Sequence, residues 1–217
     1  MRIAILHPQT SFVRGGAELH TEALTRSLRE AGHDAEIVTI AGKWYPGAEI
    51  VHQMAVWRSF DVSESNGMKI DAVISLKFPA YLAPHDRKIV WLIHQHRSAY
   101  ELWDHPDYGD LKVQEEGEQV RDLIHAGDRV GLGEAKRIFT NSKNVQQRLW
   151  NALRIPAEHL YHPSPATTAL LAMMYLKSII SPRLSRTDCI TRIVPSDELM
   201  TDCKRSFFFC NCSSARF

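Results

Sequence analysis

Polar and charged residues follow each of the short apolar runs in this sequence. A glycine pair comes soon after the first run and side chains with donors or acceptors follow the later ones, the residues being Arg14, Gly15, Gly16, Glu18, Lys77, His94, Arg97, Asn141 and Ser142. Glycines let a ligand approach the backbone, and the unpaired N–H groups of a helix that begins there attract a phosphate, a carboxylate or a hydroxyl. Together with imidazole, guanidinium and amide groups, they predict a small-molecule site.

The elements that would position these residues are buried strands alternating with amphipathic helices. We predict strands at residues 3–6, 35–40, 71–76, 88–93 and 137–142. We predict a helix over 17–31, with Leu24 and Leu28 on its apolar face and Gly32 as its stop, and a second helix capped by Ser142. This order is typical of an α/β fold, a Rossmann-like parallel sheet with helices on both faces. In such a sheet ligands bind beyond the carboxyl ends of the strands, where the polar residues would converge.

Two segments are less regular. Residues 41–62 predict one or two short strands, and residues 43–58 mix aromatic and basic side chains that suit peripheral membrane contact, although packing in the core is favoured. Residues 97–134 form a polar insertion in which a loop precedes a helix interrupted near Gly127 and Gly131. We interpret its acidic run as a solvated face.

Composition limits the function classes. The 217 residues are 44% hydrophobic and 24% charged with a formal net charge of +1, which is ordinary for a globular protein and gives no argument for nucleic acid as a partner. The N-terminus does not read as a signal peptide, and no apolar stretch approaches the roughly 18 residues of a membrane span. We therefore expect a cytoplasmic protein.

Several common sites are not indicated. The glycines do not fit a dinucleotide or Walker fingerprint, and no serine stands in a nucleophile elbow. His94 and His96 alternate in an extended segment and so point the same way, with His85 and His105 as further candidates, but they lack a defined carboxylate partner. Cys189, Cys203, Cys210 and Cys212 do not form paired C-x-x-C units and are interpreted as incidental. We predict neither a metal site nor a cofactor.

Three stretches carry a resemblance to a known family. They are residues 1–40, with a strand, a G-G-A-E turn and a helix; "KIVWLIHQHR" at 88–97; and residues 131–165 around "RIFTNS". The chain resembles the N-terminal domain of family 4 glycosyltransferases, which are retaining enzymes of GT-B architecture. The resemblance implies two Rossmann-like domains facing each other across a cleft, the first holding mainly the acceptor and the second the nucleotide-sugar donor. It also implies sugar transfer to a hydroxyl without a bound metal.

The resemblance assigns roles to residues of this chain. Gly15 and Gly16 would form the cleft loop that touches donor phosphate or acceptor, and His94 would be the catalytic histidine that binds a sugar hydroxyl. The other substrate contacts implied are Glu18, Arg97, Asn141 and Ser142. His96 would bind or would pack and orient its neighbours. The partners implied for the full-length family are a nucleotide-sugar donor and a sugar or lipid-linked acceptor.

The resemblance ends near residue 165. Residues 166–217 contain no glycine and follow neither helical nor strand periodicity well, so we predict an irregular tail that is not a native continuation of domain 1–165. The basic pair and the E-x7-E segment of the family's donor domain have no candidate there. We expect this chain alone to show no transferase activity. The alternatives are a non-catalytic module that binds a ligand or partner, and a nucleotide-sugar epimerase of the same architecture.

Overall fold

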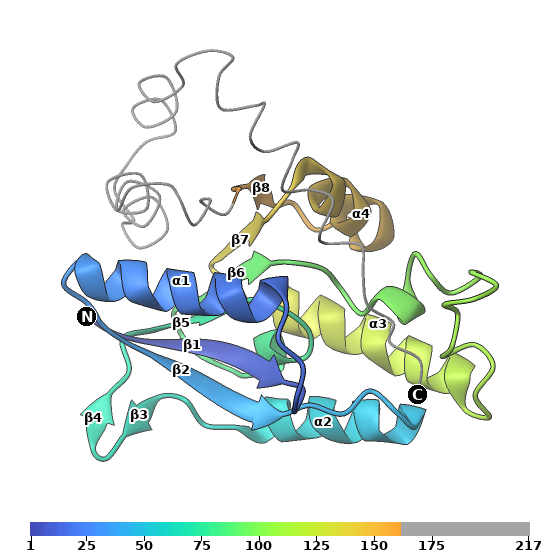
Figure 1. Ribbon diagram of the computed structural model, residues 1–217, viewed down its shortest axis with the longest axis horizontal. Coiled ribbons are helices and arrows are strands. Elements are labelled where there is room, and N and C mark those ends of the chain that lie inside the picture. The colour runs from blue at the N-terminus through green and yellow to red at the C-terminus, as the bar shows by residue number, and fades with distance from the viewer. Residues whose placement is uncertain (162–217) are drawn as a thin grey trace, which may run out of the picture. The chain divides into compact units, whose positions relative to one another are not determined.

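The structure, a computed structural model, describes residues 1–161 and contains a six-stranded sheet. All its strands are parallel, in the order β2-β1-β5-β6-β7-β8 (Figure 1). The strands are β1 (Arg2–Gln9), β2 (Asp34–Ala41), β5 (Ala72–Ser75), β6 (Lys88–Leu92), β7 (Arg137–Thr140) and β8 (Glu158–His159). A small antiparallel hairpin, β3 (Glu64–Ser65) and β4 (Met68–Lys69), precedes β5. The predicted Rossmann-like α/β fold is confirmed.

Helices cover both faces of this sheet. They are α1 (Gly16–Glu30), α2 (Gly47–Ser59), α3 (Gly117–Gly133) and α4 (Lys143–Leu153), with short 3-10 turns η1 (Ala80–Leu82) and η2 (Arg97–Ala99). The connection that contains α1 leads from β1 toward one side of the sheet, to β2. The connections that contain α2, α3 and α4 lead toward the other side of the sheet. Because such crossovers are right-handed, α1 lies on one face, over β1 in Figure 1, and α2 to α4 lie on the other.

The side chains of β1 show how the two faces are filled. Ala4 and Leu6 belong to the core cluster that includes Ile50 of α2, Ile124 of α3 and Leu149 of α4. Residues of opposite parity point to the other face, where the fully buried His7 meets α1. Because all the strands are parallel, their carboxyl ends lie along one edge, which we call the carboxyl edge of the sheet.

Residues 47–59 form helix α2, so the prediction of short strands in 41–62 is wrong. Ile50, Met54 and Trp57 recur at helical spacing and are buried, Trp57 completely. Other apolar residues, Val51 and Val56, lie between them, which blurs the helical period in the sequence. The interpretation of this segment as core packing is confirmed for the three buried residues.

Helix α3 runs without a break, so the predicted interruption near Gly127 and Gly131 is wrong. A Cβ atom on Gly131 would lie 2.7 Å from a methyl group of Leu82 and 3.0 Å from the Tyr81 carbonyl oxygen. A Cβ atom on Gly127 would lie 2.5 Å from the Met54 methyl group. The two glycines share one face of the helix and let it pack closely on η1 and α2.

The predictions near the ends of elements have mixed outcomes. The first strand extends to Gln9 rather than ending at Leu6, while the 137–142 strand ends at Thr140. Gly32 follows α1 with a φ of +82°, which agrees with its predicted role as a stop. No helix within residues 1–161 combines the length and apolar character needed to cross a membrane. The predicted tail, 166–217, and all four cysteines lie outside the described residues.

Candidate functional site

The loops that follow β1, β5, β6 and β7 meet at the carboxyl edge of the sheet. Backbone hydrogen bonds join neighbouring strand ends: the Ile93 N–H donates to the Leu76 carbonyl (2.9 Å) and the Asn141 N–H donates to the Leu92 carbonyl (3.1 Å). The sheet order places Gly15–Gly16, His94 and Asn141 along this same edge. The structure thus places along one edge the three groups on which the sequence hypothesis depends.

Gly15 is the N-cap of α1, and Gly16 is the first residue of the helix and is exposed. Gly15 has a φ of −141°, which any residue adopts, and an added Cβ would make only an ordinary 3.6 Å contact with Glu18. The turn itself therefore does not require glycine at position 15. What the pair does provide is access to the N–H groups at the start of α1.

Glu18 lies at the centre of a buried polar cluster that joins α1 to two strands. One carboxylate oxygen, Oε2, accepts the Gly15 N–H at 2.7 Å. The other, Oε1, lies 3.2 Å from His7 Nε2 and 3.4 Å from Lys77 Nζ. The Thr21 hydroxyl lies 3.2 Å from His7 Nδ1, on the other side of the ring. All three charged or titratable side chains are at least nine-tenths buried at the residue level.

Burial and pairing set the electrostatics of this cluster. Burial acts to raise the pKa of Glu18, but hydrogen bonds from backbone N–H groups and the charge of Lys77 outweigh it and lower the pKa. Burial lowers the pKa of Lys77 against the opposing effect of Glu18. Burial, helped by Lys77, also lowers the pKa of His7. We infer an ionised Glu18 beside a neutral His7 that carries its proton on Nε2, because a carboxylate only accepts.

His94 follows β6 after one residue, Ile93, and lies close enough to Lys77 for that charge to act on it. Its Nδ1–H donates to the Gln95 carbonyl oxygen at 2.7 Å, so in the neutral ring Nε2 is the acceptor. Burial lowers the pKa of His94, with further lowering from the charges of Lys77 and Arg97. His94 is therefore neutral at pH 7 and presents an unprotonated nitrogen at the carboxyl edge.

His96 packs rather than reaching outward. Its ring lies 5.3 Å from that of Phe78 and 5.7 Å from that of Trp44, measured between centroids. Burial lowers the pKa of His96 to about 4. Among residues 1–161, no three histidine, cysteine, aspartate or glutamate side chains gather as metal ligands would. Of the two roles left open for His96, these contacts favour packing.

Arg97, a predicted contact, pairs with a neighbour at the edge of the site. Its Nε donates to Glu101 at 3.0 Å, and Arg148 from α4 donates to the same carboxylate oxygen at 2.9 Å. With the Lys77–Glu18 pair included, the group holds three cations (Lys77, Arg97 and Arg148) and two carboxylates (Glu18 and Glu101). Its net charge is +1. This group of five side chains is thus weakly positive.

Asn141 and Ser142 have different positions in the loop after β7. The amide oxygen of Asn141 is buried and accepts no hydrogen bond within residues 1–161. The Ser142 hydroxyl accepts the Val145 N–H at 3.2 Å and so caps α4, as predicted. Asn141 therefore has an unused acceptor, whereas one lone pair of Ser142 is already engaged.

Sequence reasoning missed Arg148 at this edge, and it left His7 and Lys77, which directly follow predicted strands, without an assigned contact. His7 continues the alternation of Ile3 and Ile5, which would have placed it on the α1 face if the strand had been extended. Lys77 follows a buried strand directly, which is a usable signal. Arg148 reaches the site only through the packing of α4, which no local pattern reports.

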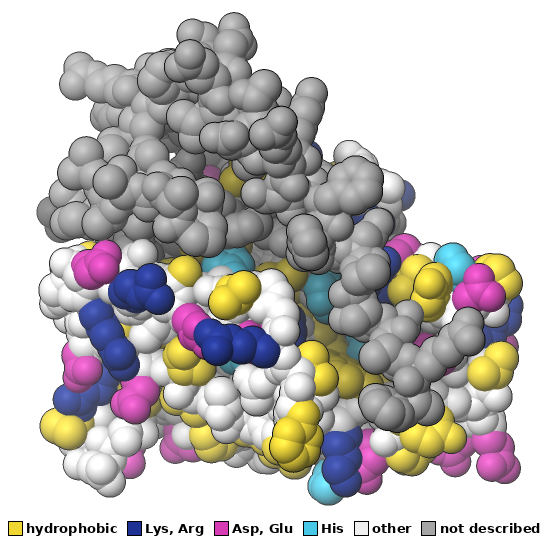
Figure 2. Space-filling view, in the orientation of Figure 1, with side chains coloured by type: hydrophobic (Ala, Val, Ile, Leu, Met, Phe, Trp, Pro, Cys, Tyr) yellow, Lys and Arg dark blue, Asp and Glu magenta, His cyan; other side chains and the backbone are white. Residues whose placement is uncertain are grey.

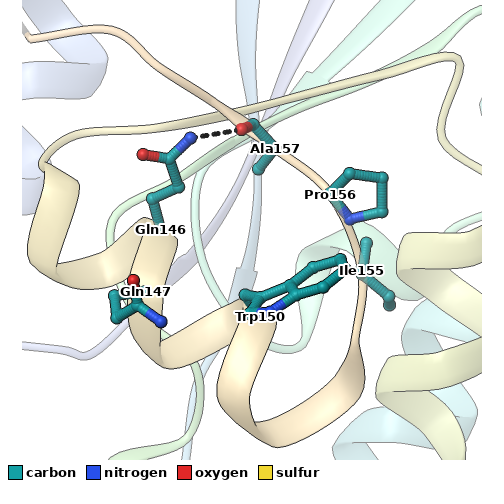
Figure 3. Close-up of a pocket in the computed structure, with 6 residues that line it drawn as sticks. All are labelled: Gln146, Gln147, Trp150, Ile155, Pro156 and Ala157. Carbon is teal, nitrogen blue, oxygen red and sulfur yellow. Dashed lines mark hydrogen bonds between the residues drawn. The ribbon is translucent and has the colours of Figure 1, made fainter.

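The described surface offers one other feature near α4. A shallow pocket of about 260 Å³ lies between α4 and the segment leading to β8, at the outer edge of the sheet, and its lining residues are Gln146, Gln147, Trp150, Ile155, Pro156 and Ala157. Figure 3 shows the Trp150 ring extending toward Ile155 and Pro156, while Gln146 donates to the Ala157 carbonyl at 2.6 Å. It is separate from His94. On the face shown in Figure 2, acidic, basic and apolar side chains are interspersed over the described residues.

Comparison of the chain with protein-family models and with curated protein sequences gave no match.

Proposed function

We propose that residues 1–161 form the acceptor-binding half of a retaining glycosyltransferase, with the ligand held at the carboxyl edge of the sheet. The observation that carries this proposal is the environment of His94, a half-buried neutral imidazole just beyond the end of a central strand with Nε2 left as an acceptor. A neutral nitrogen of this kind accepts a hydrogen bond from a sugar hydroxyl.

The neighbouring groups suit a ligand rich in hydroxyls. The Asn141 amide oxygen supplies a second buried acceptor. The N–H groups at the start of α1 supply donors, because the first turn of a helix has no internal partners for them. A hydroxyl both donates and accepts, so a polyol matches this mixture better than a ligand that only accepts.

The charge of the edge argues for the acceptor rather than the donor. Lys77 already pairs with Glu18, and Arg97 and Arg148 share Glu101, which leaves a net charge of +1. A departing nucleoside diphosphate develops more negative charge than this set balances, and one missing donor of this kind costs about 10²–10³ in rate. Our proposal therefore includes no turnover of a nucleotide sugar by residues 1–161 alone.

Binding and turnover are tested separately on the full 217-residue chain. Amide NMR spectra are recorded with methyl glucoside, methyl mannoside and myo-inositol, and then with UDP-glucose and GDP-mannose. We expect shifts at Gly16, His94 and Asn141 with at least one of the uncharged polyols. Release of UDP or GDP is measured in parallel, and none is expected.

The role of His94 is tested by substitution. His94→Ala removes one hydrogen bond to the ligand, worth about 1 kcal/mol, and should weaken binding about fivefold to tenfold. His52→Ala is the matched control, because His52 is exposed on α2. Equal affinity of the His94→Ala variant and the wild type, or turnover of a nucleotide sugar, would show that the proposal is wrong.

A non-catalytic binding module is the second candidate, and one feature favours it. Phe12, in the loop between β1 and α1, is completely exposed and has a φ of +63°, and Val13 beside it is half exposed. An exposed phenylalanine with left-handed backbone is unusual and suits contact with a partner. Failure of every polyol and nucleotide sugar to shift the amide signals would favour this second candidate.

A further inference from the structure

Asp128 of α3 is a completely buried carboxyl group that the proposed chemistry does not use. Its Oδ1 accepts the Tyr81 hydroxyl at 2.7 Å and its Oδ2 accepts the Tyr100 hydroxyl at 2.8 Å. The two tyrosines come from different segments, Tyr81 from η1 after β5 and Tyr100 from the turn after η2. One carboxyl group therefore ties two loops of the carboxyl edge to α3.

No basic side chain compensates this carboxyl group within residues 1–161. The cations of the neighbouring elements bind elsewhere: Arg58 of α2 and Lys88 of β6 both donate to Glu134, at 2.7 Å and 2.8 Å. Where α2 faces α3 beside Gly127, it presents the uncharged Met54. The groups that do act on Asp128 are uncharged hydroxyls and an amide. An ionised carboxyl group buried without a counter-charge destabilises the folded state.

The connection from Asp128 to His94 runs through Gln95. The Gln95 side chain is buried and its amide faces Asp128, although no hydrogen bond of ordinary length and angle joins the two groups. The Gln95 carbonyl oxygen accepts the His94 Nδ1–H at 2.7 Å, the bond that leaves Nε2 as acceptor. Gln95 therefore faces Asp128 with its side chain and holds the His94 ring with its backbone carbonyl.

The rest of the His94 loop is anchored to the same helix. Arg121 and His125 of α3 both bond to the Ala99 carbonyl oxygen, at 3.0 Å each. The His125 ring also stacks on Tyr100, with 4.3 Å between ring centroids. The charged groups of α3 that act on Tyr100 or His125 are Arg121, Asp122, Asp128 and Arg129. Arg121 and His125 hold the loop backbone, whereas Asp128 holds the Tyr100 side chain and faces that of Gln95.

We propose that Asp128 is a positioning residue whose bonds to Tyr81 and Tyr100, and whose contact with Gln95, couple the protonation of this carboxyl to the orientation of His94. The inference rests on the proposed role of His94, but its test needs no ligand. Both carboxylate oxygens accept a tyrosine hydroxyl. A proton on Asp128 adds a donor, so at least one tyrosine reorients to accept it, and Gln95 adjusts beside it.

The change falls in an accessible pH range. Burial raises the pKa of Asp128 to about 7, against the lowering effect of the tyrosine and Gln95 side chains. His94, His96 and His125 all have pKa values lowered below the usual 6.5, so they titrate at lower pH. A response of His94 near pH 7 would therefore report a group other than these histidines.

The test follows the ring nitrogen signals of His94 in the full chain, labelled with ¹⁵N at histidine, between pH 5.5 and 8.5 without ligand. We expect an inflection near pH 7 in the wild type and its loss in Asp128→Asn. Asp122→Asn, an exposed aspartate of the same helix, is the matched control and should keep the inflection. A wild-type signal without this inflection, or an unchanged inflection in Asp128→Asn, would overturn the proposal.

If Asp128→Asn does not fold, a second variant tests the same coupling between Asp128 and His94. Tyr100→Phe removes one hydrogen bond to the ionised carboxylate, so it should move the inflection to higher pH by about one unit. Tyr108→Phe, at a half-exposed tyrosine, should leave it in place. An inflection that Tyr100→Phe does not move contradicts the proposal. Absence of sugar binding by the wild type would instead count against the proposed function and leave this result intact.

Discussion

Replacing Glu18 by glutamine removes the charge of this residue and keeps its hydrogen bond to the Gly15 N–H. Glutamine also serves at the third position of a capping box, so its amide oxygen can still accept the Gly15 N–H. What is lost is the negative charge 3.4 Å from Lys77 Nζ, together with the oxygen that accepts the His7 Nε2–H, because an amide NH2 group takes its place. Because the side chain of Lys77 is only 11% exposed, its ammonium group would be left buried without a counter-charge.

The size of the effect depends on whether Lys77 loses its proton or stays charged in the folded variant. At pH 7, neutralising a lysine of ordinary pKa 10.5 costs about 5 kcal/mol, which is the ceiling of the penalty. Breaking a buried ion pair by removing one partner usually costs about 3–5 kcal/mol, and the long distance here favours the lower end. We expect about 3 kcal/mol, or a melting temperature about 6–12 °C lower.

The assay is urea unfolding of the full chain, followed by far-UV circular dichroism at pH 7 and pH 9. Glu22→Gln is the matched control in the same helix, because Glu22 pairs with Arg14 where the two side chains are 42% and 68% exposed. Such an exposed pair contributes about 0–1 kcal/mol. The difference between the two variants measures what burial adds.

The pH dependence gives a second check on the reasoning. Because the folded pKa of Lys77 lies below its ordinary value, stability rises with pH toward 10.5, and it rises more steeply once Glu18 is gone. At pH 9 the cost of neutralising such a lysine is only about 2 kcal/mol, so the loss of stability caused by Glu18→Gln should be smaller than at pH 7. A Glu18→Gln variant as stable as Glu22→Gln at pH 7, or a deficit that grows with pH, would refute the argument.

Two further predictions concern stability. Hydrogen bonds from Arg58 and Lys88 lower the pKa of Glu134 to about 2. The stabilising effect of Glu134 is therefore present above pH 4.5 and is lost as the pH falls toward 2. Glu134→Gln should flatten the acid unfolding curve between these two pH values. Gly131→Ala should cost about 1–3 kcal/mol in urea unfolding, because its Cβ would press on Leu82 and the Tyr81 carbonyl. Gly133→Ala is the control: nothing lies within 4 Å of its added Cβ, and a loss as large as that of Gly131→Ala would contradict the packing argument.

Much of the sheet could be predicted because its signals are local. The runs at 71–76, 88–93 and 137–142 are short, apolar and bounded by polar residues, as buried parallel strands are. Leu24 and Leu28 share one face of the predicted helix and are buried. Helix α2 was missed because apolar residues stand on several of its faces, so neither period dominates.

The candidate site was predictable only in part. Parallel strands meet at a common edge, so the polar residues directly after the apolar runs, His94 and Asn141 among them, could be assigned to that edge. His7 was assigned no role because that role depends on how far β1 extends. The glutamate–lysine contact joins residues 59 positions apart, and the Tyr81–Asp128 contact joins residues 47 positions apart. Such pairs have no local pattern.

The sequence by itself determined the α/β class, five of the six strands of the sheet and the edge at which polar residues collect. These follow from hydrophobic periodicity and turn residues, which act over a few neighbours. Only the tertiary structure decided that Glu18 holds Lys77, that two tyrosines converge on Asp128, and that glycines on α3 serve close packing. The physical reason is that strand order and helix packing, which arise from the whole chain, choose which distant side chains share a buried space.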